Sequence, residues 1–185
     1  MASLKEVKGR IASVNSTLKI TSAMKMVASA KLHRAQGAIE NMLPYERKLN
    51  GILSGFLSAE GSVSSPFAEK REVQRVAIVA VSSNSSLCGA FNANVAKKLH
   101  ETIASYGEKF TALMDLVLKR ENILIFPIGK KIAEATRKEG FEPQGDYQKM
   151  AEKPTYKETS NLAARLMKMF ANHEIDRVEL IYNHF

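Results

Sequence analysis

Apolar residues recur with a seven-residue period along the first third of the chain, from Leu4 to Phe56. Two interleaved rows carry the pattern, and we call their sixteen positions the seam. The first row is Leu4, Ile11, Leu18, Lys25, Leu32, Ile39, Glu46 and Leu53. The second row is Val7, Val14, Thr21, Ala28, Ala35, Met42, Leu49 and Phe56. Because a mean spacing of about 3.5 residues follows one side of a supercoiled helix, the seam predicts a long helix that pairs with a second helix.

Local signals set the limits of this predicted helix. Ser3 and Glu6 have the spacing of a capping box, which favours a helix start. Pro44 removes one backbone hydrogen bond, but the seven-residue period resumes after it, so we expect a kink rather than an end. At about 1.5 Å per residue, a helix over residues 1–57 would be roughly 80 Å long and would project from any domain of the chain. Residues 58–72 are rich in small and polar side chains and are interpreted as a linker.

From residue 73 onward, strand and helix patterns alternate. Short apolar runs predict strands at Val76–Val81, at Ile123–Phe126, where Pro127 ends the strand, and at Val178–Tyr182. The stretch Phe110–Arg120 is ambiguous and is assigned to a helix. The alternation predicts a small α/β domain at residues 73–185, with βαβαβ order, a mainly parallel sheet, three layers and right-handed crossovers.

The helices expected between these strands are marked by apolar faces, glycines and a capping box. The first has the face Phe91, Val95, Leu99 and Ile103. The second is lysine-rich, contains Ile132, Ala133 and Ala135, and lies between Gly129 and Gly140. The third opens with the capping box of Thr155 and Glu158 and has the face Leu162, Leu166, Met169 and Phe170. Each apolar face is expected to pack on the sheet.

Composition limits the classes of protein to which the chain can belong. It has 185 residues, of which 45% are hydrophobic, but no apolar run is long enough to span a membrane. The start lacks the apolar segment of a secretory signal, and we expect no signal or transit peptide. The single cysteine, Cys88, excludes an intrachain disulfide and favours a reducing compartment.

The net charge of +8 is concentrated near the N-terminus. Residues 1–34 hold seven lysines and arginines against the single acid Glu6. Such a helix suits nucleic acid, an anionic membrane, an acidic protein surface or simply solvent. The basic residues surround the helix instead of forming one stripe, and no aromatic residue precedes Tyr45. Both features count against nucleic acid and membrane.

Few residues carry recognisable chemistry. The Ser82–Gly89 loop follows the first strand, where α/β proteins bind phosphates, but it lacks the glycines and lysine of a phosphate-binding loop. We interpret it as a turn, and Cys88 as a structural residue, because no acid or histidine is obviously placed to activate the thiol. The four histidines have no metal-ligand spacing. They are His33, His100, His173 and His184. The sequence therefore predicts no catalytic residue, no metal and no cofactor.

Three stretches of the sequence resemble one known family. The longest is Thr21-Ser-Ala-Met-Lys-Met-Val-Ala-Ser-Ala-Lys-Leu32, preceded by Ile11–Ile20 and followed by Arg34-Ala-Gln36. The second is the loop that contains Leu87, Cys88, Gly89, Phe91 and Asn92, and the third is Ile181-Tyr-Asn-His-Phe185. In this order the stretches resemble the gamma subunit of the F-type ATP synthase of bacteria.

The resemblance implies a non-catalytic rotor. In the family, gamma is the central stalk: its first and last helices form an antiparallel coiled coil inside the ring of alpha and beta subunits. It transmits torque between that ring and the membrane ring of c subunits, and its α/β domain lies beside epsilon. It binds no nucleotide, nucleic acid or small molecule, and it works at the cytoplasmic face of the bacterial inner membrane.

The resemblance also implies which residues make contacts. The coiled-coil positions would be Leu4, Val7, Ile11, Val14, Leu18, Thr21, Ala28 and Leu32. The contacts with the alpha and beta subunits would be Met24, Lys25, Met26, Lys31, Arg34 and Gln36. Lys25 occupies a seam position, where a buried lysine is costly unless paired, and acidic loops of the beta subunits would supply the pair. Taken alone, Met24 and Met26 are either ordinary helix residues or a flexible apolar contact surface.

Two departures from the family pattern bear on these expectations. Asn84-Ser85-Ser86 stands where the family usually has Asp-Arg-Gly. The sequence also stops at Phe185, where the family continues to a C-terminal helix. We therefore expect a truncated α/β domain, and a first helix that pairs with another chain, folds back on its own domain or frays.

Two other classes of function stay open at this point. A basic coiled-coil protein that binds nucleic acid would show DNA affinity that falls steeply with salt. An α/β enzyme would need a ligand-sized polar pocket at the carboxyl ends of the strands.

Overall fold

The computed structural model describes residues 3–58, 65–69, 71–111 and 120–184. The chain divides into two compact units, Met1–Val63 and Ser64–Phe185, and each is described by itself. Within the described residues, no helix combines the length and the apolar character needed to cross a membrane.

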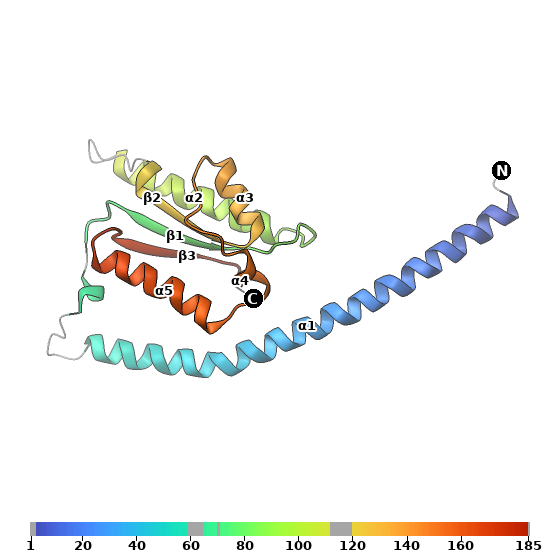
Figure 1. Ribbon diagram of the computed structural model, residues 1–185, viewed down its shortest axis with the longest axis horizontal. Helices are drawn as coiled ribbons and strands as arrows, with labels where there is room; N and C mark the ends of the chain where they lie inside the picture. Colours follow the sequence, from blue (N-terminus) through green and yellow to red (C-terminus); the bar gives the residue numbers. More distant parts are fainter. Residues whose placement is uncertain (1–2, 59–64, 70, 112–119, 185) are drawn as a thin grey trace. The chain divides into compact units, whose positions relative to one another are not determined.

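The described part of the first unit is one helix, α1, from Leu4 to Ser58. Figure 1 shows it as a continuous and gently bent helix. At its start the Glu6 backbone N–H donates to Ser3 Oγ at 3.3 Å, whereas the Glu6 carboxylate pairs with Arg10 at 3.1 Å instead of closing the capping box. The helix continues through Pro44, and a kink at that residue stays a prediction.

The seam side chains of α1 are exposed. Leu18 and Leu32, for example, expose 65% and 54% of their surface. The helix is continuous from Leu4 to Ser58, and whether it pairs with another chain, folds back on its own domain or frays stays a prediction. Helices in proteins gain most of their stability from packing an apolar side against a neighbour, and we therefore still expect the seam to pair with a second helix.

The second unit is built on a three-stranded parallel sheet. Its strands are β1 (Val76–Val81), β2 (Ile123–Ile128) and β3 (Arg177–Ile181), in the spatial order β2-β1-β3. β1 lies in the centre, and its first five residues are buried, as its uninterrupted apolar sequence predicts. The α/β class and the parallel sheet predicted from the sequence are confirmed.

Helices cover both faces of this sheet (Figure 1). On one face lie α2 (Phe91–Thr111) and α3 (Lys130–Lys138), which bury Val95, Leu99 and Ile132 against it. On the other lie α4 (Gln148–Glu152) and α5 (Tyr156–Ala171), which bury Met150 and Leu162. Two short 3-10 helices, η1 (Pro66–Ala68) and η2 (Arg120–Asn122), precede β1 and β2. The apolar helix faces predicted from the sequence therefore pack on the sheet, giving three layers.

A buried phenol joins α2 to β3. Tyr106 of α2 exposes only 3% of its surface, and its hydroxyl donates to the Glu179 carboxylate. Burial raises the pKa of the Tyr106 phenol above its ordinary value, and the hydrogen bond to the Glu179 carboxylate raises it further. The phenol therefore stays neutral and acts as a donor, which satisfies a polar group beside the core.

The prediction that Pro127 ends the second strand is wrong. β2 runs to Ile128, and Pro127 lies opposite Ala80 of β1. The Ile125 carbonyl accepts from the Gln144 backbone N–H on the outer side of β2, and backbone groups two residues apart point to the same side. The nitrogen of Pro127 therefore faces away from β1, so its missing N–H costs no hydrogen bond between the strands.

Three smaller differences concern element limits. β3 begins at Arg177 and ends at Ile181, one residue earlier at each end than predicted. α4 was not predicted, because five residues are too few to show a helical period. Of the helix assigned to Phe110–Arg120, α2 includes the part up to Thr111 and η2 begins at Arg120, whereas residues 112–119 lie outside the described residues.

Thr136 offers a test of the packing of α3. Its side chain is fully buried, and among the described residues its hydroxyl has no hydrogen-bond partner. We expect Thr136→Val, which keeps the shape and removes the hydroxyl, to raise the free energy of unfolding by about 1 kcal/mol. Urea unfolding followed by circular dichroism measures this change. Thr136→Ser retains the hydroxyl and loses a methyl group, so it should destabilise the domain; stabilisation by both variants would contradict this reason.

Candidate partner surfaces

Beside the seam, and sharing Ala28 with it, α1 carries a shallow apolar groove of about 460 Å³. It is lined by Ile20, Ala23, Met24, Val27, Ala28 and Lys31. Residues 20, 24, 27 and 31 follow the spacing of one helix side, and at about 100° per residue this side lies next to the seam. Sequence reasoning missed Ile20 and Val27, although their spacing is visible in the sequence. The groove and the seam together form an apolar surface wider than a single coiled-coil contact requires.

The six proposed ring contacts do not share one side of α1. Met24 and Lys31 lie in the groove, and Lys25 lies on the seam. Met26 is two residues from Met24, about 200° around the helix, and therefore points away from the groove. Both methionines are two-thirds exposed, at 67% and 68%. An apolar surface on opposite sides of one helix suits a helix that is surrounded by partners.

The other two proposed ring contacts extend this surface. Arg34 is exposed and, three residues after Lys31, continues the groove side. Gln36 is half-buried. It is four residues after Leu32 and therefore lies beside the seam. All six residues are accessible to a partner, but only Met24 and Lys31 are brought together in one groove.

Two polar seam positions, Thr21 and Lys25, differ in what a covering partner must supply. The Thr21 hydroxyl donates to the Thr17 carbonyl at 2.8 Å, so it needs no hydrogen bond from outside the helix. Lys25 has no such internal partner in the described residues. A lysine covered in the seam requires an acid, whereas Thr21 can pack by its methyl group.

The cations of α1 are largely unpaired. Of the seven between residues 1 and 34, Arg10 alone has a salt bridge among the described residues, to Glu6 at 3.1 Å with both side chains exposed. An exposed pair of this kind contributes little stability. The remaining six make no salt bridge among the described residues, and they would attract an acidic partner surface.

The loop after β1 is held together by Asn92. Its Oδ1 accepts from the Ser83 backbone N–H at 3.0 Å, and its Nδ2 donates to the Ser85 carbonyl at 2.8 Å and to Cys88 Sγ at 2.9 Å. Cys88 is a half-buried free thiol within this network. Leu87, in contrast, is 96% exposed. The loop is therefore held by several side-chain hydrogen bonds and exposes one apolar side chain, Leu87, to solvent.

Of the other two residues, Gly89 sets the backbone conformation of the loop, and Phe91 is partly exposed. Gly89 has a backbone φ of 57°, in the left-handed region that favours glycine. Phe91 begins α2 and is 40% exposed. The sequence-predicted loop residues thus comprise one fully exposed apolar side chain, Leu87, one partly exposed, Phe91, and three that set the shape of the loop.

Asn84 joins three elements, a function that sequence reasoning missed. Its Oδ1 accepts from the Lys130 backbone N–H at 2.7 Å, and its Nδ2 donates to the Gln148 carbonyl and to Glu152 Oε1, each at 3.0 Å. The loop after β1, the start of α3 and the whole of α4 are therefore held by one amide. An aspartate at this position could accept from Lys130 but could donate nothing to α4.

This difference gives a prediction for Asn84→Asp. The new carboxylate would face the Gln148 carbonyl and the Glu152 carboxylate without a proton to share, so we expect a loss of about 1–2 kcal/mol in the free energy of unfolding. Backbone amides of α4 should exchange with solvent faster, as measured by hydrogen exchange. Adding Glu152→Gln to the same chain supplies a donor to the new carboxylate and should restore part of the loss; no restoration would contradict the assigned contact.

The start of α3 is not available to a phosphate. Its first three backbone N–H groups donate to Asn84 Oδ1 at 2.7 Å, to the Ser83 carbonyl at 3.2 Å and to Ser82 Oγ at 2.9 Å. These groups are the ones that a helix start offers to an anion. The first three backbone N–H groups of α3 are thus engaged by the loop after β1 and offer no donor to an anion.

A cavity of about 400 Å³ does lie at the carboxyl ends of β1 and β2. It is lined by Val81, Ser82, Ser83, Phe91, Ile128, Met150, Ala151, Pro154 and Thr159. None of these residues is charged, and the lining is mainly apolar. The described residues also contain no group of three histidine, cysteine or acidic side chains that could hold a metal ion. This cavity does not have the polar lining that the enzyme alternative requires.

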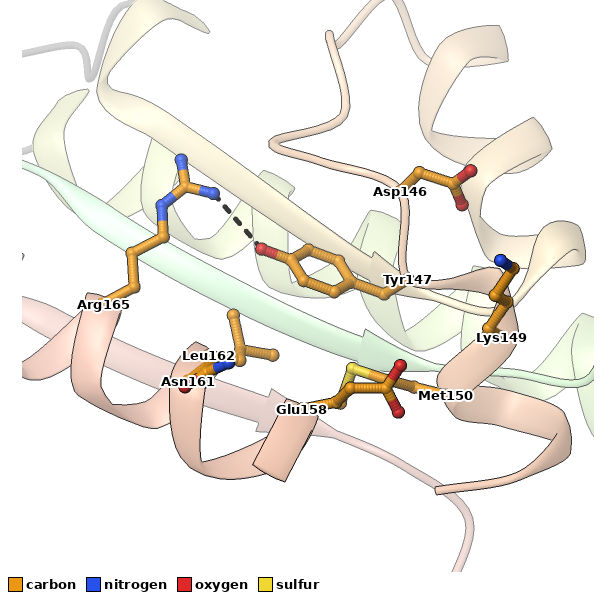
Figure 2. A pocket seen from close by; sticks show the side chains of 8 residues that line it. All are labelled: Asp146, Tyr147, Lys149, Met150, Glu158, Asn161, Leu162 and Arg165. Atoms are coloured by element: carbon orange, nitrogen blue, oxygen red, sulfur yellow. Dashed lines mark hydrogen bonds between the residues drawn. The ribbon is translucent and has the colours of Figure 1, made fainter. Parts of the chain in front are cut away.

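A second cavity, of about 440 Å³, lies between α4 and α5 (Figure 2). Its charged residues are Asp146, Lys149, Glu158 and Arg165, so positive and negative charges balance. Arg165 donates to the Tyr147 hydroxyl at 3.2 Å and to the Gln144 carbonyl at 3.0 Å. Because Arg165 already donates to protein groups, and because the positive and negative side chains are equal in number, this cavity favours no particular ligand.

Similarity to known proteins agrees with the resemblance seen in the sequence. Residues 3–185 match a protein family described as ATP synthase. The ATP synthase gamma chain of Bacteroides fragilis is 65% identical over 185 residues, which is 100% of this chain and 61% of the relative. That of Bacteroides thetaiotaomicron is 64% identical over 100% of this chain and 59% of the relative. That of Flavobacterium johnsoniae is 39% identical over 100% of this chain and 60% of the relative. The chain thus spans about three fifths of the length of the curated relatives that it matches.

Proposed function

The chain belongs to the family of ATP synthase gamma chains, and on that premise we propose that it is the central-stalk subunit of a bacterial F-type ATP synthase. The observation that carries the proposal is α1, a helix of 55 residues with an exposed apolar seam and a second apolar side around Met24. A helix of this kind suits a shaft that is paired along one side and surrounded on the others.

In this function the chain carries no catalytic residue. The catalytic sites lie in the beta subunits, and the chain turns within the ring of alpha and beta subunits. Its α/β domain contacts epsilon and the membrane ring of c subunits at the cytoplasmic face of the inner membrane. The occupied start of α3 and the apolar cavity at the strand ends support a domain that binds partners and no nucleotide.

The alternative of a nucleic-acid-binding coiled coil gains no support. The family match covers residues 3–185, and the relatives are named gamma chains of ATP synthase. The cations of residues 1–34 are accompanied by no aromatic side chain that could stack on bases. An acidic protein surface is therefore the partner that fits them best.

Co-purification tests the proposal. The chain is expressed with the alpha and beta subunits of Bacteroides fragilis, both alone and followed by the part of the Bacteroides fragilis gamma chain that has no counterpart in it. We call the second form the extended chain. The extended chain should be retained with alpha and beta through size-exclusion chromatography, and the 185 residues alone more weakly. An extended chain that elutes free of both subunits would refute the proposed function.

Lys25 gives a more local prediction. In the extended chain assembled with alpha and beta, Lys25→Ala should change the rate of ATP hydrolysis by about fivefold, the value of one charged contact of about 1 kcal/mol. Lys19 lies about 120° around α1 from Lys25 and outside the seam, so Lys19→Ala removes the same charge without the contact assigned to Lys25. Steady-state ATPase assays compare the two. Equal rates for Lys25→Ala, Lys19→Ala and the unchanged chain would remove Lys25 from the contacts.

A further inference from the structure

The segment that leads from α1 into the α/β domain is not free where the structure describes it. It includes η1, the short teal helix of Figure 1, which lies beside the C-terminal end of α5. Ser65 caps η1, because its Oγ accepts from the Phe67 backbone N–H at 3.3 Å and its carbonyl accepts from the Ala68 backbone N–H at 3.0 Å. The phenyl ring of Phe67 stacks on Phe170 of α5 with 6.2 Å between ring centroids. The segment is thus held at a position about 100 residues away in the sequence.

Arg71 makes the strongest contacts between this segment and α5. Its side chain is only 10% exposed, and its guanidinium carbon lies 4.3 Å from the centre of the Phe170 ring. One guanidinium nitrogen donates to the Phe170 carbonyl at 2.8 Å, and two others contact Glu69 Oε2 at 2.9 Å. A planar guanidinium can stack on a ring and donate in its plane at the same time, which an ammonium group cannot.

The carbonyl that Arg71 contacts is at the negative end of α5. The helix closes with a Schellman motif, in which the His173 N–H donates to the Phe170 carbonyl at 3.1 Å and the Glu174 N–H donates to the Met169 carbonyl at 2.8 Å. A cation beside such carbonyls is favoured by the helix dipole. Arg71 therefore binds a fixed and electrostatically suited acceptor.

A second contact holds the next residues of the segment. Asp176 lies just before β3, and its Oδ2 accepts from the backbone N–H groups of Gln74 and Arg75 at 2.9 and 2.8 Å. The Asp176 N–H donates to the Arg75 carbonyl at 2.8 Å. The chain that enters β1 is thus attached both to the end of α5 and to the start of β3.

From these contacts we propose that Arg71 is a positioning residue for torque transmission, an inference that rests on the proposed rotor function. It anchors residues 65–69 to the end of α5, so that a load arriving along the chain from α1 is carried by α5 and β3 as well as by β1. Without Arg71, the load would first pull residues 65–69 away from α5 before it reached the sheet.

The first test measures the anchor in the chain itself. Arg71→Met keeps a long side chain but removes the charge and the donors. The substitution removes the hydrogen bond from the charged guanidinium to the Phe170 carbonyl, which holds η1 against α5. The amide of Ala68, which donates within η1, should therefore exchange with solvent about tenfold faster. Arg71→Lys should give an intermediate rate. Arg75 is the matched control, because its side chain is exposed and its contacts to Asp176 come from the backbone, so Arg75→Met should leave the rate unchanged. Equal Ala68 exchange in Arg71→Met and the unchanged chain would overturn the anchor.

The second test measures the load in the extended chain, assembled with its partner subunits in membrane vesicles. Arg71→Met should lower the number of ions pumped per ATP hydrolysed, and Arg75→Met should not. Val95→Ala, a core substitution in α2 away from the anchor, should lower the melting temperature without changing this ratio. An unchanged ratio in Arg71→Met, despite faster Ala68 exchange, would overturn the load-carrying function. If even the unchanged extended chain fails to assemble, the proposed function fails, and exchange of Ala68 still decides the anchor.

Discussion

Replacing Leu18 and Leu32 together by glutamate should abolish retention of the extended chain with the alpha and beta subunits. Each leucine contributes about 1.5–3 kcal/mol when it is fully buried against a partner, and both are exposed in the chain alone. The loss of both would weaken assembly by at least about a hundredfold, since each 1.4 kcal/mol changes an equilibrium constant tenfold. Two carboxylates buried in the seam without partners would add to this cost. Size-exclusion chromatography of the co-expressed subunits measures retention.

The control for this prediction adds the same charge elsewhere on α1. Ala12 and Ser16 lie on the side of the helix opposite to the seam, and both are exposed. Ala12→Glu with Ser16→Glu should therefore leave most of the retention intact. Equal loss in both double variants would mean that added negative charge, and not the seam, decides assembly.

Gly129→Ala should reduce the free energy of unfolding of the α/β domain by about 3 kcal/mol or more. Gly129 has a φ of 106°, and a Cβ built there would lie less than 3.0 Å from the Ser82 carbonyl oxygen. Ser82 belongs to the loop that caps α3, so the backbone cannot move aside without breaking that cap. Backbone strain alone costs about 1–3 kcal/mol, and the contact with Ser82 adds to it. Urea unfolding monitored by circular dichroism gives the change.

Gly89 separates the two causes. Its φ of 57° is also in the left-handed region, but a Cβ there would contact nothing within 4 Å. Gly89→Ala should therefore cost about 1–2 kcal/mol, the strain of the left-handed conformation alone. If the two variants lose equal stability, the close approach of Gly129 to Ser82 has no energetic consequence.

Elements with strong periodicity could be predicted from the sequence. α1 follows from the seam, and β1 follows from a run of β-branched residues that is buried on both faces. The end of α5 illustrates the limit of such reasoning. His173 occupies the left-handed position after the helix, where glycine is the most common residue. Local rules describe what a residue favours, and tertiary contacts decide what it adopts.

The candidate site could be predicted only in part. The seam depends on the sequence of one helix, so its residues were found without a structure. Asn84 and Arg71 could not be found in this way, because their partners are about 65 and 100 residues away. Pro127 was misjudged for the same reason: its effect on the strand depends on which side of the sheet its nitrogen faces. Contacts between segments far apart in the sequence produce no local pattern from which they could be predicted.

Rotation of the chain within the ring tests the central claim most directly. The extended chain, with a probe on Lys98→Cys of α2, is assembled with surface-fixed alpha and beta subunits, and single molecules are observed during ATP hydrolysis. The side chain of Lys98 is exposed, and its ammonium group lies 3.7 Å from the Glu101 carboxylate of the same helix. If α1 is a shaft, the probe turns in one direction and stops when ATP is removed. A probe that stays still on complexes that hydrolyse ATP would contradict the account.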